Sequence, residues 1–201
     1  MRAVNATPTD VPNPMAFHFT RLELAGVVLV ERNAIRDERG LFEETYRASE
    51  FGAFGIDAVF RQDAHSQSQK GVLRGLHYQK SPMAQGKLVW VAAGRIFDVA
   101  VDVRRASRSY GKWVAVELAA DNGRCLYIPP GFAHGFYTLS ETADIMYKMT
   151  QEYSPLHERG IIWNDPELAI AWPGTHPTIS PRDAAFPPLR NADIETDPAM
   201  I

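Results

Sequence analysis

Short runs in which apolar and polar residues alternate at every second position constrain the fold of this chain most strongly. The run RIFDVAVDVR at 95–104 places Phe97, Val99, Val101 and Val103 on one face. WVAVEL at 113–118 and ADIMYKMT at 143–150 alternate in the same way. A period of two is that of a β-strand. Such runs recur at intervals of roughly 8–14 residues between turn signals, which predicts an all-β sandwich or barrel.

Helical signals are weak, and the ends of the chain differ from its middle. One or two helical turns are expected around Arg47–Phe54 and a short piece after Asp183, with an irregular tail from Ala185. Residues 1–18 are polar and contain three prolines, which is typical of a flexible arm. We therefore expect one domain over residues 19–190, preceded by this arm and followed by a tail at 191–201.

Composition excludes several classes of protein. Of 201 residues, 45% are hydrophobic and 22% charged, as in ordinary soluble domains. No apolar run approaches the roughly 20 residues that span a membrane, and the first residues lack the apolar core of a signal peptide. Cys125 is the single cysteine, so no intrachain disulfide can form. We expect a cytoplasmic protein. The net charge of −3, with dispersed basic residues, argues against nucleic acid as a partner.

Two histidines stand in motifs similar to those of metal-binding cupin barrels. In GVLRGLHYQ at 71–79, Gly71 is followed by five residues and then by His77, but Gln79 occupies the place of the second histidine of the cupin motif. PGFAH at 130–134 resembles the second cupin motif and ends in His134. A stable site needs three or four oriented ligands. The sequence therefore predicts a cupin scaffold without a metal.

Acid–base chemistry without a metal is the alternative use of these residues. Histidine is the side chain best suited to abstract a proton near neutral pH. Tyr147 falls on the apolar face of its predicted strand, where its hydroxyl needs either a task or a hydrogen-bond partner in the core. Arg39, Arg74 and Lys87 are either anion-binding residues or solvated surface cations.

Arg74 and His77 pose a geometric problem. Strict alternation sends side chains three residues apart to opposite faces of a strand. Gly75 lies between them, and a β-bulge at this glycine would bring both side chains into one cavity.

A set of long motifs resembles one family. The motifs are GVLRGLHYQ, AQGKLVWV, FDVAVDVR, IPPGFAHGF and YKMT, together with DERGLFEETY at 37–46, FRQDAHSQS at 60–68, HERGIIWNDPEL at 157–168 and ISPRD at 179–183. Between Leu22 and Leu189 the chain is similar to the dTDP-4-dehydrorhamnose 3,5-epimerases.

The resemblance implies a cupin-type jelly roll with a few short helices, a homodimer, and catalysis without a metal or other cofactor. It implies a substrate that is a dTDP-linked 4-keto-6-deoxyhexose, inverted at C3 and C5. His77 matches the family's base, Asp183 the aspartate that orients it, and Tyr147 the proton donor. The matches to substrate-binding residues are Arg39, Glu44, Gln62, Arg74, Lys87, His134, Glu158 and Arg182. Arg39 is expected to reach across the dimer, and Lys87 to stabilise the developing enolate.

Two positions depart from the family pattern, and the first of them keeps alternatives open. The family commonly has asparagine where this chain has Ala64, and frequently lysine where it has Arg182. Ala64 offers no hydrogen bond, so an enzyme that inverts C3 or C5 alone remains an alternative. A metal-dependent cupin such as a dioxygenase is disfavoured by Gln79. A non-catalytic sugar-nucleotide binding protein is disfavoured by the joint presence of His77, Tyr147 and Asp183.

Overall fold

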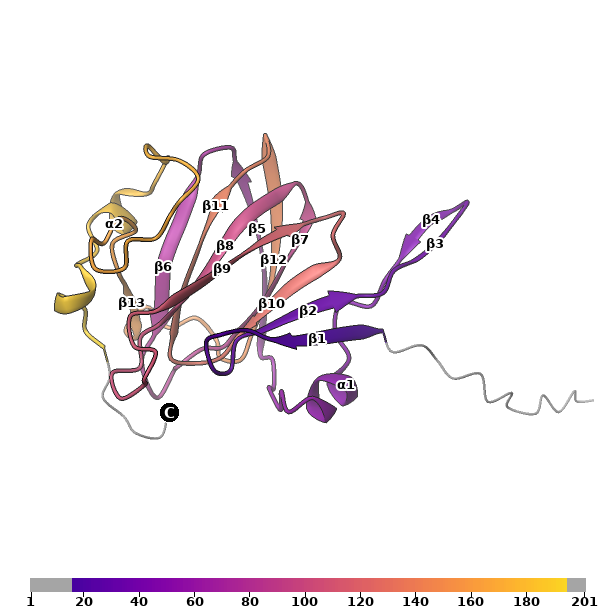
Figure 1. The fold of residues 1–201 in the computed structure, drawn as a ribbon, viewed down its shortest axis with the longest axis horizontal. Helices are drawn as coiled ribbons and strands as arrows, with labels where there is room; N and C mark the ends of the chain where they lie inside the picture. Colours follow the sequence, from indigo (N-terminus) through magenta and orange to yellow (C-terminus); the bar gives the residue numbers. More distant parts are fainter. Residues whose placement is uncertain (1–15, 195–201) are drawn as a thin grey trace, which may run out of the picture.

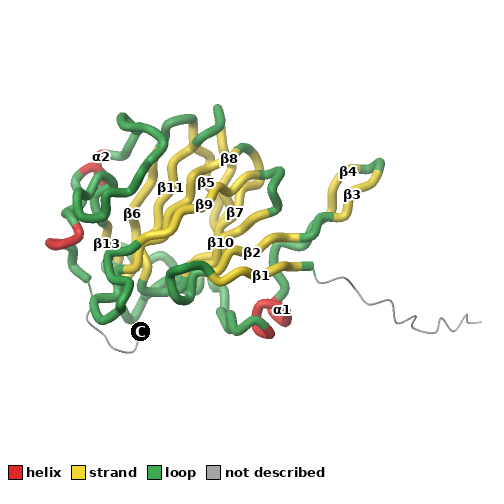
Figure 2. The backbone as a smooth tube through the Cα atoms, in the orientation of Figure 1, coloured by secondary structure: helices red, strands yellow, loops and turns green. Residues whose placement is uncertain are grey.

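Two antiparallel β-sheets packed face to face form the body of the molecule (Figure 1). The computed structural model of the chain describes residues 16–194. Figure 2 shows that the short helices lie only at the margins of the sheets. The predicted all-β, cupin-type jelly roll with a few short helices is confirmed.

The larger sheet has six strands. In spatial order they are β1 (Phe17–Arg21), β2 (Val28–Arg32), β10 (Arg124–Ile128), β7 (Lys87–Ala93), β12 (Thr142–Met149) and β5 (Gln62–Gln69). The smaller sheet has five, in the order β13 (Glu158–Gly160), β6 (Leu73–Gln79), β11 (Phe132–Thr138), β8 (Arg95–Asp102) and β9 (Trp113–Ala119). Strands β5 and β6 are therefore neighbours in sequence but belong to different sheets.

The core between the sheets is built by the predicted alternation. Leu118 of β9 is buried in it, and Val114 and Val116 of the same strand pack against it. Strand β8 is buried on both faces: Ala100 points into this core, whereas Val99 and Val101 point to the opposite side. Because aliphatic side chains of both sheets interdigitate here, the two layers are held together by burial of apolar surface.

Each sheet is also covered on its outer face. A C-terminal segment with Ile161, Leu168 and Leu189 packs on the five-stranded sheet. Figure 1 shows this segment, in yellow, beside β6 and β13. On the six-stranded sheet, α1 (Ala48–Ala53) inserts Phe51, whose ring packs edge-on against Phe17 at 5.2 Å. The helix lies within the predicted range.

The helix predicted after Asp183 begins earlier. Helix α2 spans Pro181–Ala184 and contains Asp183, because Ser180 caps its first turn and Pro181 occupies the first helical position. A 3₁₀ turn, η1 (Leu189–Asn191), follows in the tail that was expected to be irregular. Helix α2 matters for the site because it fixes where Asp183 lies.

Described structure extends slightly beyond the predicted domain at both ends. Strand β1 begins at Phe17, and Ala192 and Ile194 are buried at the other end. The rest of the expected arm and tail, residues 1–15 and 195–201, lies outside the described residues. Within the described range, no helix is long and apolar enough to cross a membrane.

A two-stranded hairpin projects away from the sheets (Figure 1). Strands β3 (Ile35–Asp37) and β4 (Gly40–Phe42) pair only with each other among the described strands. Ile35 and Phe42 are each 66% exposed on this hairpin.

Candidate active site

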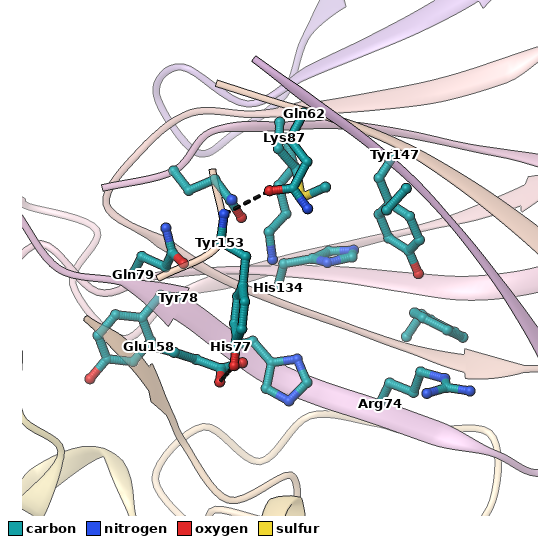
Figure 3. A pocket seen from close by; sticks show the side chains of 14 residues that line it. Gln62, Arg74, His77, Tyr78, Gln79, Lys87, His134, Tyr147, Tyr153 and Glu158 are labelled. Carbon is teal, nitrogen blue, oxygen red and sulfur yellow. Dashed lines mark hydrogen bonds between the residues drawn. The ribbon is translucent and has the colours of Figure 1, made fainter. Parts of the chain in front are cut away.

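A pocket of about 240 Å³ opens between the two sheets and collects most of the predicted site residues. Figure 3 shows their side chains converging from several strands. From the five-stranded sheet come Arg74, His77, His134 and Glu158, and from the six-stranded sheet come Gln62, Lys87 and Tyr147. His77 and Tyr147 therefore reach the same cavity from opposite sheets.

His77 is paired with an aspartate behind it. Its Nε2 lies 3.0 Å from Oδ1 of Asp183, which is buried. The other carboxylate oxygen of Asp183 accepts a hydrogen bond from the backbone N–H of Gly75 at 3.1 Å. Burial raises the pKa of Asp183, but His77 and the Gly75 amide outweigh it and lower that pKa to about 2. Asp183 is thus an anion at neutral pH.

A β-bulge at Gly75 brings Arg74 and His77 to one cavity, as the sequence suggested. His77 pairs with His134 and Arg74 with Phe136, so three steps on β6 face two steps on β11. Gly75 has φ +129°, and a Cβ there would lie 2.5 Å from the Gly135 Cα. Glycine is therefore required for the bulge, and the bulge also presents the N–H that holds Asp183.

Phe186 is a neighbour of His77 that sequence reasoning missed. Its ring meets the imidazole edge-on, with centroids 5.7 Å apart. It can do so because Gly160, the strand neighbour of His77 on β13, has no side chain: a Cβ there would lie 2.3 Å from the phenyl ring. Nothing in the local sequence indicated this contact, since Phe186 follows α2 in an irregular segment.

Tyr147 faces the pocket from β12. Its hydroxyl makes one hydrogen bond, at 3.0 Å, with the hydroxyl of Ser66 on the adjacent strand β5. Burial raises the pKa of Tyr147 well above its ordinary value, against the opposing effects of Ser66 and Arg74. The phenol is therefore protonated at neutral pH and can act as an acid. Ser66 was missed, although alternation along β5 puts it on the face that carries Gln62.

Lys87, which enters the pocket from β7 of the six-stranded sheet, has a lowered pKa. Burial lowers the pKa of its ammonium to about 8, while the charges of Asp98 and Glu158 oppose the shift. His134 Nε2 lies 2.7 Å from Asp98 Oδ1, and both residues are buried. Burial also lowers the pKa of His134, with Asp98 acting in the opposite direction. Asp98 was seen in the sequence only as part of an alternating strand.

Glu158 organises the mouth of the pocket. Its Oε2 accepts hydrogen bonds from the Tyr153 hydroxyl and from Arg182, both at 2.7 Å. The backbone N–H of Tyr153 in turn donates to Gln62 Oε1 at 2.6 Å. Arg182 also approaches Asp183, with Nε 3.4 Å from Oδ1. A half-exposed tyrosine and an arginine thus stand at the entrance.

Two predicted binding residues lie away from the pocket. Arg39 is 84% exposed at the tip of the β3–β4 hairpin, where it pairs with Asp37. Glu44 pairs with Arg47 near the start of α1. Neither lines the pocket within one chain.

Gln79, which stands where cupins carry a metal ligand, holds the backbone instead. Its amide nitrogen donates to the carbonyls of Met83 and Glu152, and its oxygen accepts from the Ser154 N–H at 2.7 Å. Among residues 16–194, no group of three or more His, Cys, Asp or Glu side chains is arranged to hold a metal ion.

Comparison with known proteins places this geometry in one family. Residues 21–191 match the family model described as dTDP-4-dehydrorhamnose 3,5-epimerase. The chain is 51% identical over 168 residues to the dTDP-4-dehydrorhamnose 3,5-epimerase of Salmonella typhimurium, covering 83% of this chain and 92% of that protein. It is 49% identical over 164 residues to the Shigella flexneri enzyme, covering 81% and 91% respectively.

Solved structures agree. A dTDP-6-deoxy-D-glucose-3,5-epimerase from Legionella pneumophila, in complex with dTDP-4-keto-L-rhamnose, superposes with a TM-score of 0.84 at 47% identity, covering 87% of this chain and 94% of that one. A 3′-monoepimerase from Streptomyces bikiniensis, in complex with dTDP-quinovose, gives 0.80 at 34% identity, covering 84% and 86%. With its matched model, its relatives and its fold in agreement, the chain belongs to the dTDP-4-dehydrorhamnose 3,5-epimerase family.

Proposed function

We propose that the chain is an isomerase that inverts C3 and C5 of dTDP-4-dehydro-6-deoxyglucose to give dTDP-4-dehydro-L-rhamnose. The observation that carries the assignment of roles is the placement of His77 and Tyr147 on opposite sheets around one pocket. Inversion at a carbon requires a proton to leave from one face of the sugar ring and to arrive at the other. A base and an acid on facing walls meet this requirement.

His77 is the proposed base. The ketone at C4 acidifies the hydrogens on C3 and C5, because each carbanion delocalises onto oxygen as an enolate. The imidazole takes the proton and becomes positively charged. Asp183, ionised and 3.0 Å away, stabilises that charge and orients the ring.

Tyr147 is the proposed acid, and Lys87 the group that stabilises the enolate oxygen. Tyr147 keeps its proton at neutral pH because burial raises its pKa, so it can return a proton to the carbon. Lys87 remains largely protonated at pH 7 with a pKa of about 8. A buried positive charge close to a developing oxyanion is worth more than one in water.

The remaining cations and polar groups would bind the substrate's diphosphate and sugar. Arg74 and Arg182 border a second hollow, which adjoins the pocket at Arg74 and His77. Guanidinium groups suit a diphosphate because they can donate two parallel hydrogen bonds. Gln62, His134 and Glu158 are proposed to bind the sugar and nucleoside.

We also propose a homodimer in which the β3–β4 hairpin completes a partner's site. The hairpin projects from its own sheets, exposes Ile35 and Phe42, and carries Arg39 outside the pocket. Glu44, just after the hairpin, also lies outside the pocket. Apolar side chains exposed together favour burial against another surface. A cytoplasmic location stays a prediction from the sequence.

Proton exchange in heavy water tests the proposed function. The wild-type protein is incubated with dTDP-4-dehydro-6-deoxyglucose, and the sugar is followed by NMR. Deuterium at both C3 and C5, with formation of the L-rhamno product, is the expected result. An unchanged substrate with no deuterium would contradict the proposal.

Inversion of one carbon alone is the second candidate. It is supported by the similarity to the Streptomyces bikiniensis 3′-monoepimerase and by Ala64, which lines the pocket beside Tyr147 and offers no polar side chain. Deuterium at C3 only, or at C5 only, would select it in the same experiment.

A further inference from the structure

One face of strand β5 carries two serines whose partners are both proposed site residues. Gln62, Ala64, Ser66 and Ser68 alternate on the inward side of this strand. Ser66 meets the Tyr147 hydroxyl at 3.0 Å, and Ser68, which is buried, accepts a hydrogen bond from Arg74 Nε at 3.0 Å. The two serines therefore contact an acid on the neighbouring strand and a cation from the other sheet.

The register of the sheet produces the first of these contacts. Tyr147 lies directly opposite Ala64, so Ser66 is its diagonal neighbour on the same face. Diagonal neighbours in an antiparallel pair are within reach of an aromatic side chain. The phenol oxygen thus extends along β5 to the one hydroxyl that faces it.

The direction of this hydrogen bond decides what Tyr147 can do. A tyrosine hydroxyl has one proton to donate and lone pairs to accept with. If Tyr147 donated to Ser66, its proton would point away from the sugar. If Ser66 donates, the phenol proton is free to point into the pocket, and after its transfer the tyrosinate oxygen keeps a donor.

We infer that Ser66 is a positioning residue for the epimerisation: its hydroxyl donates to Tyr147 and so aims the phenol proton at the sugar carbon. The inference rests on the proposed function and assigns to it a residue that acts through the Tyr147 hydroxyl. In the step concerned, the phenol O–H breaks, a C–H bond forms at the enolate carbon, and the electrons of the O–H bond remain on a tyrosinate. Before the next turnover the imidazolium of His77 releases its proton to water, and the tyrosinate takes up one proton from water, so both groups return to their starting states.

If Ser66 acts through Tyr147, its loss should change the rate of product formation more than the rate of deuterium exchange into the substrate. Proton removal by His77 is independent of Ser66, whereas proton return by Tyr147 is not. Loss of the Ser66 hydroxyl should therefore slow product formation while wash-in of deuterium to recovered substrate continues. Because a well-placed acid contributes on the order of 100-fold or more, we expect misplacement to cost roughly tenfold in inversion.

The test compares Ser66→Thr with Ser66→Val, which differ only in a hydroxyl and both suit a strand. Each is incubated with dTDP-4-dehydro-6-deoxyglucose in heavy water, beside the wild type and Ser66→Ala. We expect Thr to retain inversion and Val and Ala to lose it roughly tenfold, with exchange within about twofold of wild type. Equal inversion by Thr and Val at the wild-type rate, or parallel loss of exchange and inversion in all variants, would overturn the inference.

A double-mutant cycle separates the role of Ser66 from general damage to the fold. In a Tyr147→Phe background there is no phenol proton to aim, so Ser66→Val should cause no further loss. A further tenfold loss in that background would overturn the inference. Wild-type protein that neither exchanges nor inverts the sugar would overturn the proposed function itself, and with it the role of Ser66.

Discussion

The two sheets that form the walls of the pocket hold the proposed base, His77, and the proposed acid, Tyr147, in different ways. On the five-stranded sheet, His77 is backed by Asp183, which is fixed by the Gly75 amide and by helix α2, and Phe186 packs against the ring. On the six-stranded sheet, Tyr147 has one side-chain hydrogen bond, to Ser66, and an edge-on contact with His134 at 6.4 Å.

This difference fits the charge that His77 and Tyr147 would each acquire in the proposed reaction. In the proposed reaction His77 becomes a cation in a partly buried site, and a buried charge is costly unless an opposite charge lies close. Asp183 must therefore be ionised and immobile before the reaction begins. Tyr147, as the proposed acid, must release its proton, and further acceptors around its hydroxyl would divert that proton. The single hydrogen bond at Tyr147 suits a group that gives a proton, whereas the several contacts that fix His77 and Asp183 suit a group that accepts one.

Removing the base should have the largest effect. His77→Ala is expected to lower both deuterium exchange and inversion by about 100- to 10,000-fold, since the group proposed to take the proton, which Asp183 pairs with, is lost. NMR in heavy water measures both rates. His65→Ala is the matched control, because His65 is exposed and pairs with Asp144 away from the pocket; it should leave both rates unchanged. Full exchange by His77→Ala would assign the base elsewhere.

Removing the acid should separate the two rates. Tyr147→Phe is expected to lower inversion by about 100-fold while exchange at the face of His77 persists, because only proton return is lost. The same NMR experiment, scored as deuterium in recovered substrate against product, checks it. Equal loss of exchange and inversion would mean that Tyr147 also contributes to proton removal by His77.

Neutralising Asp183 tests whether its negative charge is needed beside His77. Asp183→Asn is expected to lower exchange by roughly tenfold to 100-fold, because the imidazolium loses its counter-charge. It should also change the pH dependence of stability. The pKa of Asp183 is about 2 in the folded chain and about 3.9 in an unfolded one, so its contribution is full above pH 4 and is lost as the pH falls towards 2.

Urea unfolding of wild type and Asp183→Asn between pH 3 and pH 6 measures this contribution. The stability difference should be largest near pH 6 and shrink as the solution is acidified. A difference that grew at low pH would show that the carboxylate is not stabilised by its neighbours.

Changes at Lys87, which lies on the same sheet as Tyr147, should have the smallest effect on the reaction rate. Its pKa is lowered to about 8 by burial, so the ammonium is present below pH 8 and is lost above it. We expect kcat to fall by a few-fold between pH 7 and pH 9. Lys87→Met, which has no charge to lose, should be slower at pH 7 and lack this alkaline decline. A decline of the same size in the variant would assign it to another group.

The sequence by itself determined the architecture and named most of the predicted site residues that the structure brings to the pocket. Alternation in β8, β9 and β12 predicted an all-β fold, because a period of two is a local property of the backbone. The motifs around His77, His134 and Tyr147 predicted residues that the structure brings to one pocket. Gly75 also signalled the bulge, since an isolated glycine within a strand often marks one.

Only the tertiary structure decided how these residues act on each other. Alternation puts Ser66 on the inward face of β5, but its contact with Tyr147 depends on the register between strands. Asp98 and Phe186 reach the site through sheet packing and an irregular segment, which local alternation does not encode. Arg39 and Glu44 lie outside the pocket because they stand on and beside a hairpin that leaves the sheets. Whether a side chain is a base, an acid or a solvated charge depends on burial and neighbours, and those are fixed only when distant segments pack together.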